Sequence, residues 1–393
     1  MNNNYKGIDN WRKIVAPRLF RAIGNGPAAL SNSATDRSEA LNDAFAALHL
    51  EAKVVGAQRG PVITRYMVKT GDGVRVRNIR NNLEDISMRI GIARNSIRME
   101  CGNGYVGIEL PNESRAVVPC TDIVTPVSTA DIQFGSTEIG MGVDIVGKPV
   151  KFDIRKAPHM LVAGQTGSGK SVFLNSMICN LLMNNHPDEL KLYLVDPKGT
   201  EMQCYSGITN VKVMNNVSDA VKMLGTLVDE MESRYEKFTI LGNKLGRPVR
   251  TIDEYMNIVD GAYMPRIVVI IDEVADLMAC DKHGMEINVS RLAAKARAAG
   301  IHLVLATQRP SRDVITGTIK ANLPTRIAFR LPSQYDSKTI LDEIGAESLL
   351  GKGDMLFKSE NGVSRLHGCW MSDGNISKFV DELKYVLSRI NRK

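Results

Sequence analysis

The chain has 393 residues, of which 44% are hydrophobic and 24% are charged, and its formal net charge is +7. This composition is typical of a globular protein with room for two or three domains. It contains no apolar run of about 18 residues that could span a membrane, no apolar signal-peptide core, and no C-x-x-C pair among its six cysteines that would indicate a zinc site or a disulfide framework. We therefore expect a cytoplasmic protein, and the positive charge is compatible with a polyanionic partner.

Residues 1–40 are polar and carry more basic than acidic side chains, which favours a basic, partly disordered N-terminal arm. Within it, residues 10–23 could form a short basic amphipathic helix, and residues 24–27 are typical of a linker because they combine Gly, Asn and Pro. A frayed arm without a role and a contact with nucleic acid or a partner both remain open for this segment.

Residues 41–135 are expected to form a small α+β subdomain. Helical periodicity covers residues 36–50 and 78–90, and alternating apolar residues predict strands at 60–68, 97–99 and 105–110. This part of the sequence contains no recognisable catalytic constellation.

From residue 136 to 380 the pattern alternates strand and helix, which predicts an α/β domain with a mostly parallel sheet. The expected strands are short, apolar and β-branched, as in strands buried on both faces; they are Met160–Ala163, Leu190–Val195, Arg266–Ile271, Ile301–Ala306 and Arg326–Phe329. A long helix is expected at 218–241, with Gly242 as its C-cap. Residues 381–393 are expected to be a C-terminal tail.

A phosphate-binding loop follows the first of these strands. The segment 164–171, GQTGSGKS, matches G-x-x-x-x-G-K-[ST] at every fixed position, and a helical pattern begins after it. Glycines let backbone N–H groups surround a polyphosphate, and a helix N-terminus adds partial positive charge. Lys170 would reach the β and γ phosphates of ATP, and Ser171 would ligate Mg²⁺. The predicted nucleotide-binding residues are Gly164, Gln165, Thr166, Gly167, Ser168, Gly169, Lys170, Ser171 and Val172.

Two acids, Asp272 and Glu273, end the strand Arg266–Ile271 about 100 residues after this loop. Ligands of open α/β sheets gather at the carboxyl ends of the strands. Asp272 is therefore a candidate Mg²⁺ ligand, and Glu273 is suited to polarise the attacking water. A solvated acidic pair at a strand end is the alternative.

The next strand ends at Gln308, whose amide could hydrogen-bond the γ-phosphate or the lytic water; capping of a loop is the alternative. Between the two strands, residues 290–300 form an Ala-rich helical pattern that stops at Gly300. A basic residue such as Arg297 could stabilise transition-state charge at a neighbouring subunit's nucleotide. Spacing alone favours the simpler interpretation of a solvated helix face.

These residues together make the sequence resemble the FtsK/SpoIIIE family of double-stranded DNA translocases, within the FtsK–HerA group of P-loop motors. The resemblance extends over roughly residues 45–375. It rests on PHMLVAG leading into the loop at 158–164, DPK at 196–198, ESRY at 232–235, DEVADLM at 272–278, and the unbroken run KARAAGIHLVLATQRPS at 295–311. In the small subdomain, GPV at 60–62 and GIELPN at 107–112 resemble the family's alpha subdomain.

The resemblance implies a RecA-like ATPase core, ATP and Mg²⁺ as cofactors, and a hexameric ring with duplex DNA through its centre. It places Arg297 at the family's trans-acting arginine. It places Arg309 and Lys320 in the segment that faces the central channel, where Arg312 stands in place of a small or apolar residue. Positive side chains on phosphates suit a ring that grips DNA of any sequence.

The chain departs from the family in three respects. We expect neither the N-terminal membrane helices with their linker nor a winged-helix DNA reader, because the sequence shows no such helices and only about 20 residues follow Trp370. Gln334 also occupies the position of a second trans-acting basic residue, although Lys338 is close in sequence.

The leading hypothesis from sequence is thus an ATP-driven double-stranded DNA translocase that consists of the motor alone, as in a phage or plasmid protein. A conjugative coupling or genome-packaging ATPase would carry the same motifs. A DNA-binding assembly scaffold with ATP as a structural ligand is a third possibility, which the intact Lys170, Asp272 and Glu273 disfavour.

Overall fold

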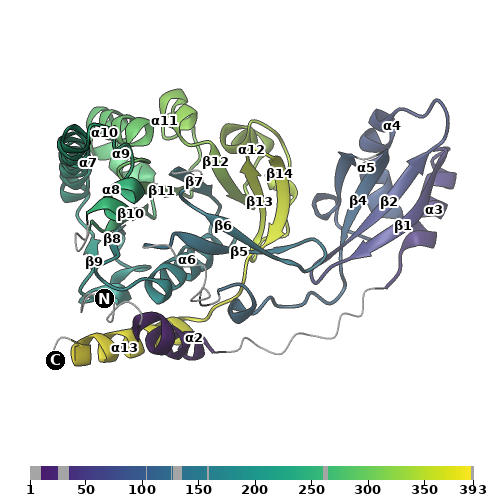
Figure 1. Cartoon of the computed structure of the whole chain (residues 1–393). Coiled ribbons are helices and arrows are strands. Elements are labelled where there is room, and N and C mark those ends of the chain that lie inside the picture. Colours follow the sequence, from purple (N-terminus) through teal and green to yellow (C-terminus); the bar gives the residue numbers. More distant parts are fainter. Residues whose placement is uncertain are drawn as a thin grey trace.

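The computed structural model describes residues 10–24, 35–102, 104–124, 126, 135–156, 159–259 and 264–390. They form a small domain built on an antiparallel sheet and a large α/β domain, which lie side by side (Figure 1). Residues 1–9 and 25–34 of the expected N-terminal arm lie outside the described part of the chain, as do the last three residues of the expected tail.

The small domain is a four-stranded antiparallel sheet with the order β1-β2-β4-β3. Its strands are β1 (Ala52–Arg59), β2 (Ile63–Thr70), β3 (Arg98–Gly102) and β4 (Tyr105–Pro111), and its helices are α3 (Ser38–Ala47), α4 (Val76–Asn81) and α5 (Leu83–Arg89). Two differences from the sequence prediction stand out. The expected helix 78–90 is two helices separated at Asn82, and β1 was not predicted because its residues alternate between exposed and half-buried rather than fully buried.

The large domain contains a ten-stranded sheet with the order β6-β5-β14-β13-β12-β7-β11-β10-β8-β9. The strands from β12 to β9 in this order are parallel, and the others pair antiparallel. The bounds are β5 (Glu138–Asp144), β6 (Pro149–Asp153), β7 (His159–Ala163), β8 (Leu190–Val195), β9 (Val211–Met214), β10 (Arg266–Ile271), β11 (Ile301–Thr307), β12 (Thr325–Phe329), β13 (Asp354–Ser359) and β14 (Gly362–His367). All five strands predicted from the sequence are present within one residue of their expected bounds.

Helices cover both faces of this sheet, so successive residues of its central strands enter different cores. In β7, Met160 and Val162 pack with α6 (Lys170–Asn184), whereas Leu161 and Ala163 pack on the opposite face. The helices of that opposite face are α7 (Val217–Leu245), α9 (Val274–Cys280), α10 (Lys282–Lys295), α11 (Gly317–Asn322) and α12 (Gln334–Leu341), and α8 (Ile252–Ile258) adjoins α7.

Both ends of the described chain pack onto the α6 face. A π-helical turn, Trp11–Val15, continues into α2 (Ala16–Ile23), which lies beside α13 (Asp373–Ile390) (Figure 1). Trp11 is 1% exposed, and its ring N–H donates to the carbonyl of Met183 at 3.0 Å. The helix expected at residues 10–23 is therefore present, and its apolar face makes it part of the core rather than a frayed arm.

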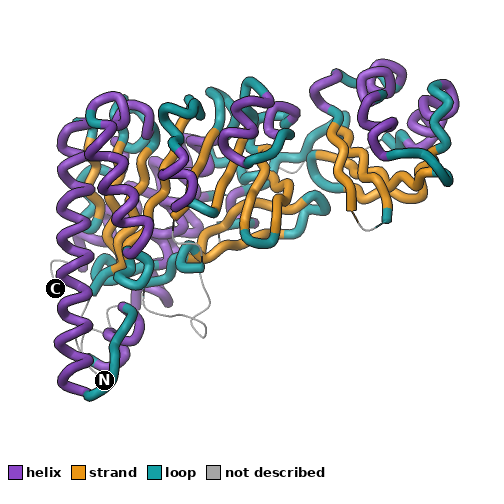
Figure 2. Tube along the Cα trace, turned by 90° about the horizontal axis from the view of Figure 1, so that it is seen from above, coloured by secondary structure: helices purple, strands orange, loops and turns teal. Residues whose placement is uncertain are grey.

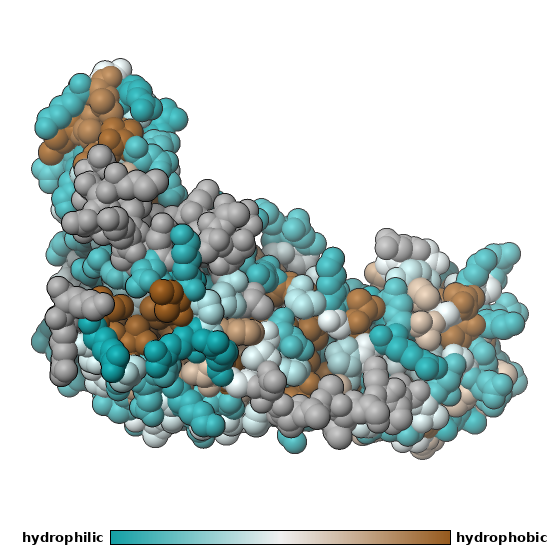
Figure 3. All heavy atoms as spheres, turned by 60° about the horizontal axis from the view of Figure 1, so that its bottom comes forward, coloured by the Kyte–Doolittle hydropathy of each residue, from teal (hydrophilic) through white to brown (hydrophobic). Residues whose placement is uncertain are grey.

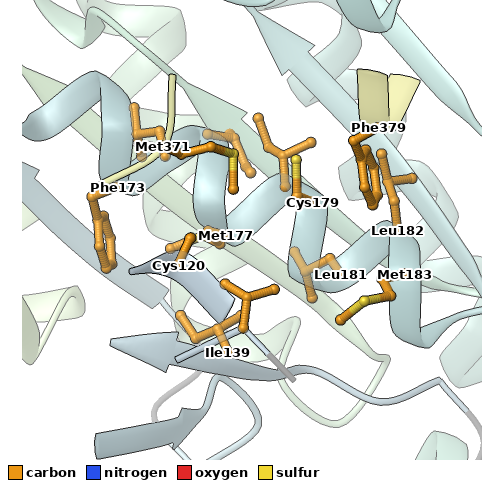
Figure 4. Packing of buried hydrophobic residues seen from close by; sticks show 14 of the residues in the cluster. Cys120, Ile139, Phe173, Met177, Cys179, Leu181, Leu182, Met183, Met371 and Phe379 are labelled. Atoms are coloured by element: carbon orange, nitrogen blue, oxygen red, sulfur yellow. The ribbon is translucent and has the colours of Figure 1, made fainter. Parts of the chain in front are cut away.

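The expected tail is likewise wrong for residues 381–390, because α13 continues to Ile390 and buries Leu383 and Leu387. Figure 4 shows Phe379 of this helix beside Leu182 of α6, and Met371 above Met177. Apolar residues at helical spacing within 373–390 were the signal that could have identified the helix from sequence.

The long helix α7 ends one turn later than expected. Gly246, with φ of +63°, adopts the left-handed conformation that closes the helix, whereas Gly242 is buried inside it. A Cβ on Gly242 would lie 3.0 Å from the carbonyl oxygen of Arg247, so this glycine serves close packing rather than capping. Figure 2 shows the end of α7 projecting beyond the rest of the domain.

A buried ion cluster joins the two domains. Arg365 on β14 donates to Glu109 on β4 at 2.6 Å and to Asp354 on β13 at 2.6 and 2.9 Å. Burial raises the pKa of Glu109, but the charges of Arg365, Arg98 and Arg65 outweigh it and lower this pKa to about 2. The carboxylate therefore contributes stability above its usual pKa and loses it only as the pH falls towards 2. Removing one partner of such a buried pair costs about 3–5 kcal/mol.

No helix in the described ranges is both long and apolar enough to cross a bilayer. The face seen in Figure 3 shows hydrophobic residues in separate patches between hydrophilic ones.

Candidate active site

The predicted phosphate-binding loop connects β7 to α6, as its sequence context requires. Gly167 and Gly169 have φ angles of +75° and +110°, which residues with a Cβ rarely adopt. A Cβ on Gly169 would also lie 2.5 Å from the backbone nitrogen of Gly353. Because Gly353 donates to the carbonyl of Ser168 at 2.8 Å, the segment before β13 is seated directly on the loop.

The helix after the loop begins at Lys170, two residues before its expected start. Its ammonium group donates to the backbone oxygen of Asp272 at 2.7 Å and to its carboxylate at 2.9 Å. Both side chains are at most 3% exposed. The parallel pairing of β7, β11 and β10 places their carboxyl ends at one edge, which brings residues about 100 positions apart into direct contact.

Glu273 is held from the neighbouring strand. Its carboxylate accepts hydrogen bonds from the hydroxyl of Thr307 at 2.6 Å and from the backbone N–H of Gln308 at 3.0 Å. The alternative of a solvated acidic pair is therefore wrong, because Asp272 and Glu273 are only 1% and 3% exposed and both have partners.

Gln308 contacts the phosphate-binding loop. Its side-chain oxygen accepts from the hydroxyl of Thr166 at 2.9 Å. This places the amide beside the loop, where a sensor of the γ-phosphate would need to be.

A cavity of about 480 Å³ opens over the loop. Of the predicted nucleotide-binding residues it is lined by all except Gly164 and Ser168, and Gln308 also contributes. Five further residues line the cavity and were not predicted from the sequence; they are Glu201, Lys352, Gly353, Cys369 and Trp370. Asp272 and Glu273 lie behind this lining rather than in it.

Glu201 reaches the cavity because a buried aspartate folds the loop that carries it. Asp196, directly after β8, accepts backbone N–H groups of Gly199, Glu201 and Met202 at 2.8–3.0 Å. Burial and the charge of Asp272 raise the pKa of Glu201, although a hydrogen bond with Ser171 lowers it in part. The motif DPK at 196–198 was the available signal, since its aspartate shapes the loop.

The oxygens of Ser171, Asp272 and Glu201 suit a hard cation such as Mg²⁺. Within the described ranges, no group of three or more His, Cys, Asp or Glu side chains could hold a metal ion by itself. Mg²⁺ is usually bound by one or two protein ligands together with substrate phosphates.

Arg297 lies far from its own phosphate-binding loop. It precedes β11, whose other end meets the loop, and seven residues of strand span roughly 20 Å. Its guanidinium donates to the carbonyl of Arg155 at 3.1 Å and lines a second cavity of about 350 Å³. Two residues of α7 fix the backbone on either side, because Arg234 donates to the carbonyl of Ala299 at 2.8 Å and Tyr235 to that of Lys295 at 2.5 Å.

The three predicted DNA-contacting residues follow β11 but differ in their surroundings. Arg309 and Arg312 are exposed, and the Arg312 guanidinium lies 5.2 Å from the centre of the Tyr335 ring. Lys320 is half-buried and forms an ion pair with Asp342 at 2.6 Å. DNA binding by these three residues stays a prediction from the sequence.

The positions considered for a second trans-acting cation are both exposed on α12. Gln334 lines a cavity of about 800 Å³ between the two domains, and the carbonyl of Lys338 accepts from Lys320 at 3.2 Å. A role of either residue at a neighbouring subunit stays a prediction from the sequence.

Comparison with known proteins identifies the family. The FtsK/SpoIIIE family profile matches residues 127–312, and the FtsK alpha domain profile matches residues 25–112. DNA translocase FtsK 2 of Neisseria meningitidis is 39% identical over 396 residues, which cover 94% of this chain and 38% of the relative. DNA translocase SpoIIIE of Bacillus subtilis is 41% identical over 371 residues, which cover 91% and 46%. The chain belongs to the FtsK/SpoIIIE family. It spans less than half the length of these relatives.

Solved structures support the fold. The conjugation coupling protein TcpA of pCW3, a monomer form with ATPγS, has a TM-score of 0.58 and 26% identity, and the match covers 88% of this chain and 99% of that one. The type VII secretion ATPase EccC of Thermomonospora curvata has a TM-score of 0.56 and 23% identity over 64% of this chain and 31% of that one, which bears on the fold alone. The predicted RecA-like P-loop ATPase core is thereby confirmed, as is the predicted resemblance to the FtsK/SpoIIIE family.

Proposed function

We propose that this FtsK/SpoIIIE-family chain is a cytoplasmic motor that hydrolyses ATP and moves along double-stranded DNA as one subunit of a hexameric ring. The family membership and the assembled phosphate site support the ATPase step. The position of Arg297 is the observation that carries the ring, because this arginine lies about a strand's length from the nucleotide that its own loop would bind.

Each residue of the site has a distinct role in this proposal. Lys170 and the N-terminus of α6 bind the phosphates, and Gln308 senses the terminal one. Glu273 orients and deprotonates the attacking water. Ser171 and Asp272 would hold Mg²⁺, which neutralises phosphate charge when it is bound. Arg297 stabilises the transition-state charge at the neighbour's site.

The DNA-binding part of the proposal rests on the chemistry of the segment after β11. Arg309, Arg312 and Lys320 present cations without base-reading amides, which suits contacts with phosphates of any sequence. Hydrolysis at the edge of the sheet would shift this segment because Gln308 and Arg309 are adjacent in the chain.

Complementation between inactive variants tests the shared site. Lys170→Ala and Arg297→Ala should each lack ATPase activity when alone. A mixture of the two should regain part of it, because a subunit with an intact loop can then receive Arg297 from its neighbour. The matched control replaces the first variant with the double variant Lys170→Ala/Arg297→Ala, which should restore nothing. If the mixture of the two single variants also regains no activity, the site is not shared between subunits.

DNA dependence is tested by steady-state ATPase activity with and without linear duplex DNA at low and high salt. Strong stimulation that weakens at high salt is expected for contacts with phosphates. Tight ATP binding with negligible turnover in the presence of duplex would instead favour the assembly scaffold. Displacement of a triplex-forming oligonucleotide would then establish movement along the duplex.

A conjugative coupling ATPase is the second candidate, and the likeness to TcpA is the observation that favours it. Genome packaging would use the same motor. A relaxase, secretion component or portal recovered with the purified chain would favour these roles over free translocation.

A further inference from the structure

The cavity over the phosphate-binding loop has a second wall that the phosphates do not explain. The loop and the first turn of α6 form one side. The other side combines the Lys352–Gly353 turn before β13 with Cys369 and Trp370 after β14. Apart from the exposed Lys352, this second wall carries no charged side chain.

Trp370 is the large aromatic group of this wall, and its backbone is fixed. Its backbone N–H donates to the carbonyl of Val118 at 2.8 Å, within an isolated parallel bridge to Pro119. The segment is extended, so neighbouring side chains alternate in direction. Cys369 and Met371 are 7% and 4% exposed, whereas Trp370 is 43% exposed. Figure 4 shows Met371 turned toward the α6 core.

The backbone around Trp370 must be fixed, because a stacking surface has to keep its position when a ligand binds. Gly368 donates to the carbonyl of Gly353 at 2.8 Å, and Gly353 in turn donates to Ser168 of the loop. Two hydrogen bonds therefore link the tryptophan segment to the phosphate-binding loop. The distance between the two walls is fixed by backbone contacts rather than by flexible side chains.

We propose that Trp370 stacks on the purine ring of ATP and so forms the base subsite of this nucleotide site. The inference rests on the proposed ATP site, whose loop holds the phosphates at the opposite wall. Val172, in the first turn of α6, lines the same cavity and offers an additional apolar contact. Stacking on an aromatic ring is tolerant of base identity because every base has a π-face. This subsite therefore favours any purine nucleotide over a bare polyphosphate.

Tryptophan fluorescence provides a direct reading of this contact. The chain contains only two tryptophans, and Trp11 is buried in the α2 segment with its ring N–H bound to Met183. ATP added to the wild-type chain without DNA should quench its emission. The Trp370→Phe variant retains Trp11 as its sole tryptophan, and its emission should not respond. An equal ATP response in this variant would overturn the proposal.

Binding measurements with a matched ligand separate stacking from a structural role. Trp370→Ala should weaken ATP binding about tenfold, on the scale typical of base stacking, and Trp370→Phe should retain most of the affinity. Inorganic tripolyphosphate has no base, so its affinity should be the same in all three proteins. Loss of affinity for both ligands would show that Trp370 only supports the fold, and unchanged affinity for both would show that it does not touch the base.

These outcomes are independent of the motor itself. They are measured without DNA, so a failure of DNA to stimulate turnover leaves them unaffected. If the wild-type chain binds neither ATP nor tripolyphosphate, the phosphate site is at fault, and with it both the proposed function and the base subsite.

Discussion

The nucleotide edge of the sheet and the segment after β11, which we propose to contact DNA, hold their charged groups in different ways. At the nucleotide edge, Lys170, Asp272 and Glu273 are buried and hydrogen-bonded to one another or to the adjoining strand. After β11, Arg309 is exposed, whereas Lys320 is half-buried and shares the Asp342 carboxylate with two other cations, Arg326 and Lys358. The comparison suggests that the first region is preorganised for one ligand geometry. The second has the charge that the proposed contact with a long polyanion would need.

The largest effect is expected at Arg297, which lies far from the phosphate-binding loop of its own chain and is proposed to act at a neighbour's site. Arg297→Ala should lower ATP turnover about 10³-fold, because a trans-acting arginine stabilises the charge of the transition state. Nucleotide binding should be unchanged. Arg291→Ala is a matched control, since Arg291 is exposed on α10 and pairs with Glu232 at 3.6 Å. Equal losses in both variants, measured by steady-state kinetics, would refute a specific role for Arg297.

A smaller but still large effect is expected at Glu273. Glu273→Gln keeps the size of the side chain and should lower turnover about 100-fold while ATP remains bound, because general-base catalysis contributes at about this level. Single-turnover kinetics and equilibrium binding would separate the two steps. If kcat persists in this variant, another group must activate the water.

The next prediction has the opposite sign. The Thr307 hydroxyl holds the Glu273 carboxylate at 2.6 Å, behind the lining of the cavity. Thr307→Val removes this bond, and the one that the hydroxyl accepts from the backbone N–H of Arg309 at 2.9 Å, with little change of shape. It should raise DNA-independent turnover by about tenfold, which is the lower end of the range for one hydrogen bond to a charged group. Thr307→Ser keeps the hydroxyl and should behave as the wild type. Unchanged basal turnover in the valine variant would show that the bond does not restrain Glu273.

The smallest effects are expected in the segment after β11 and should be unequal. Arg309→Gln should reduce the salt dependence of duplex binding by a slope of about 1, as for one lost phosphate contact. Lys320→Gln should reduce it less, because Lys320 is half-buried and already paired with Asp342. Asp342→Asn should increase DNA affinity by freeing Lys320. Equal slopes for the two glutamine variants, measured by fluorescence anisotropy, would show that Arg309 and Lys320 do not differ as phosphate contacts.

The same contrast explains how much the sequence could reveal. The loop, Asp272, Glu273 and the buried parallel strands were predictable because each obeys a local pattern of spacing or apolarity. The hydrogen bond from Thr307 to Glu273 was not predictable, because it depends on the side-chain directions at the ends of β10 and β11. The approach of Trp370 to the loop was not predictable either, because it depends on strand order. A chain order of β10, β11, β12 does not reveal that β7 lies between β11 and β12.

Errors of the sequence interpretation also have a physical cause. The boundaries at the two ends failed because α2 and α13 bury their apolar faces against each other and α6, a contact between residues more than 300 positions apart. Gly242 was mistaken for a helix end since a glycine that permits close packing looks the same in sequence as one that adopts a left-handed turn.

The ion cluster around Arg365 has a mechanical consequence. One guanidinium bridges Glu109 of the small domain and Asp354, and Asp354 is the residue after Gly353, which rests on the phosphate-binding loop. Any tilt of the small domain that keeps these pairs intact must carry the start of β13 with it. The small domain is thus mechanically coupled to the rim of the nucleotide cavity, so a force that displaces one also displaces the other.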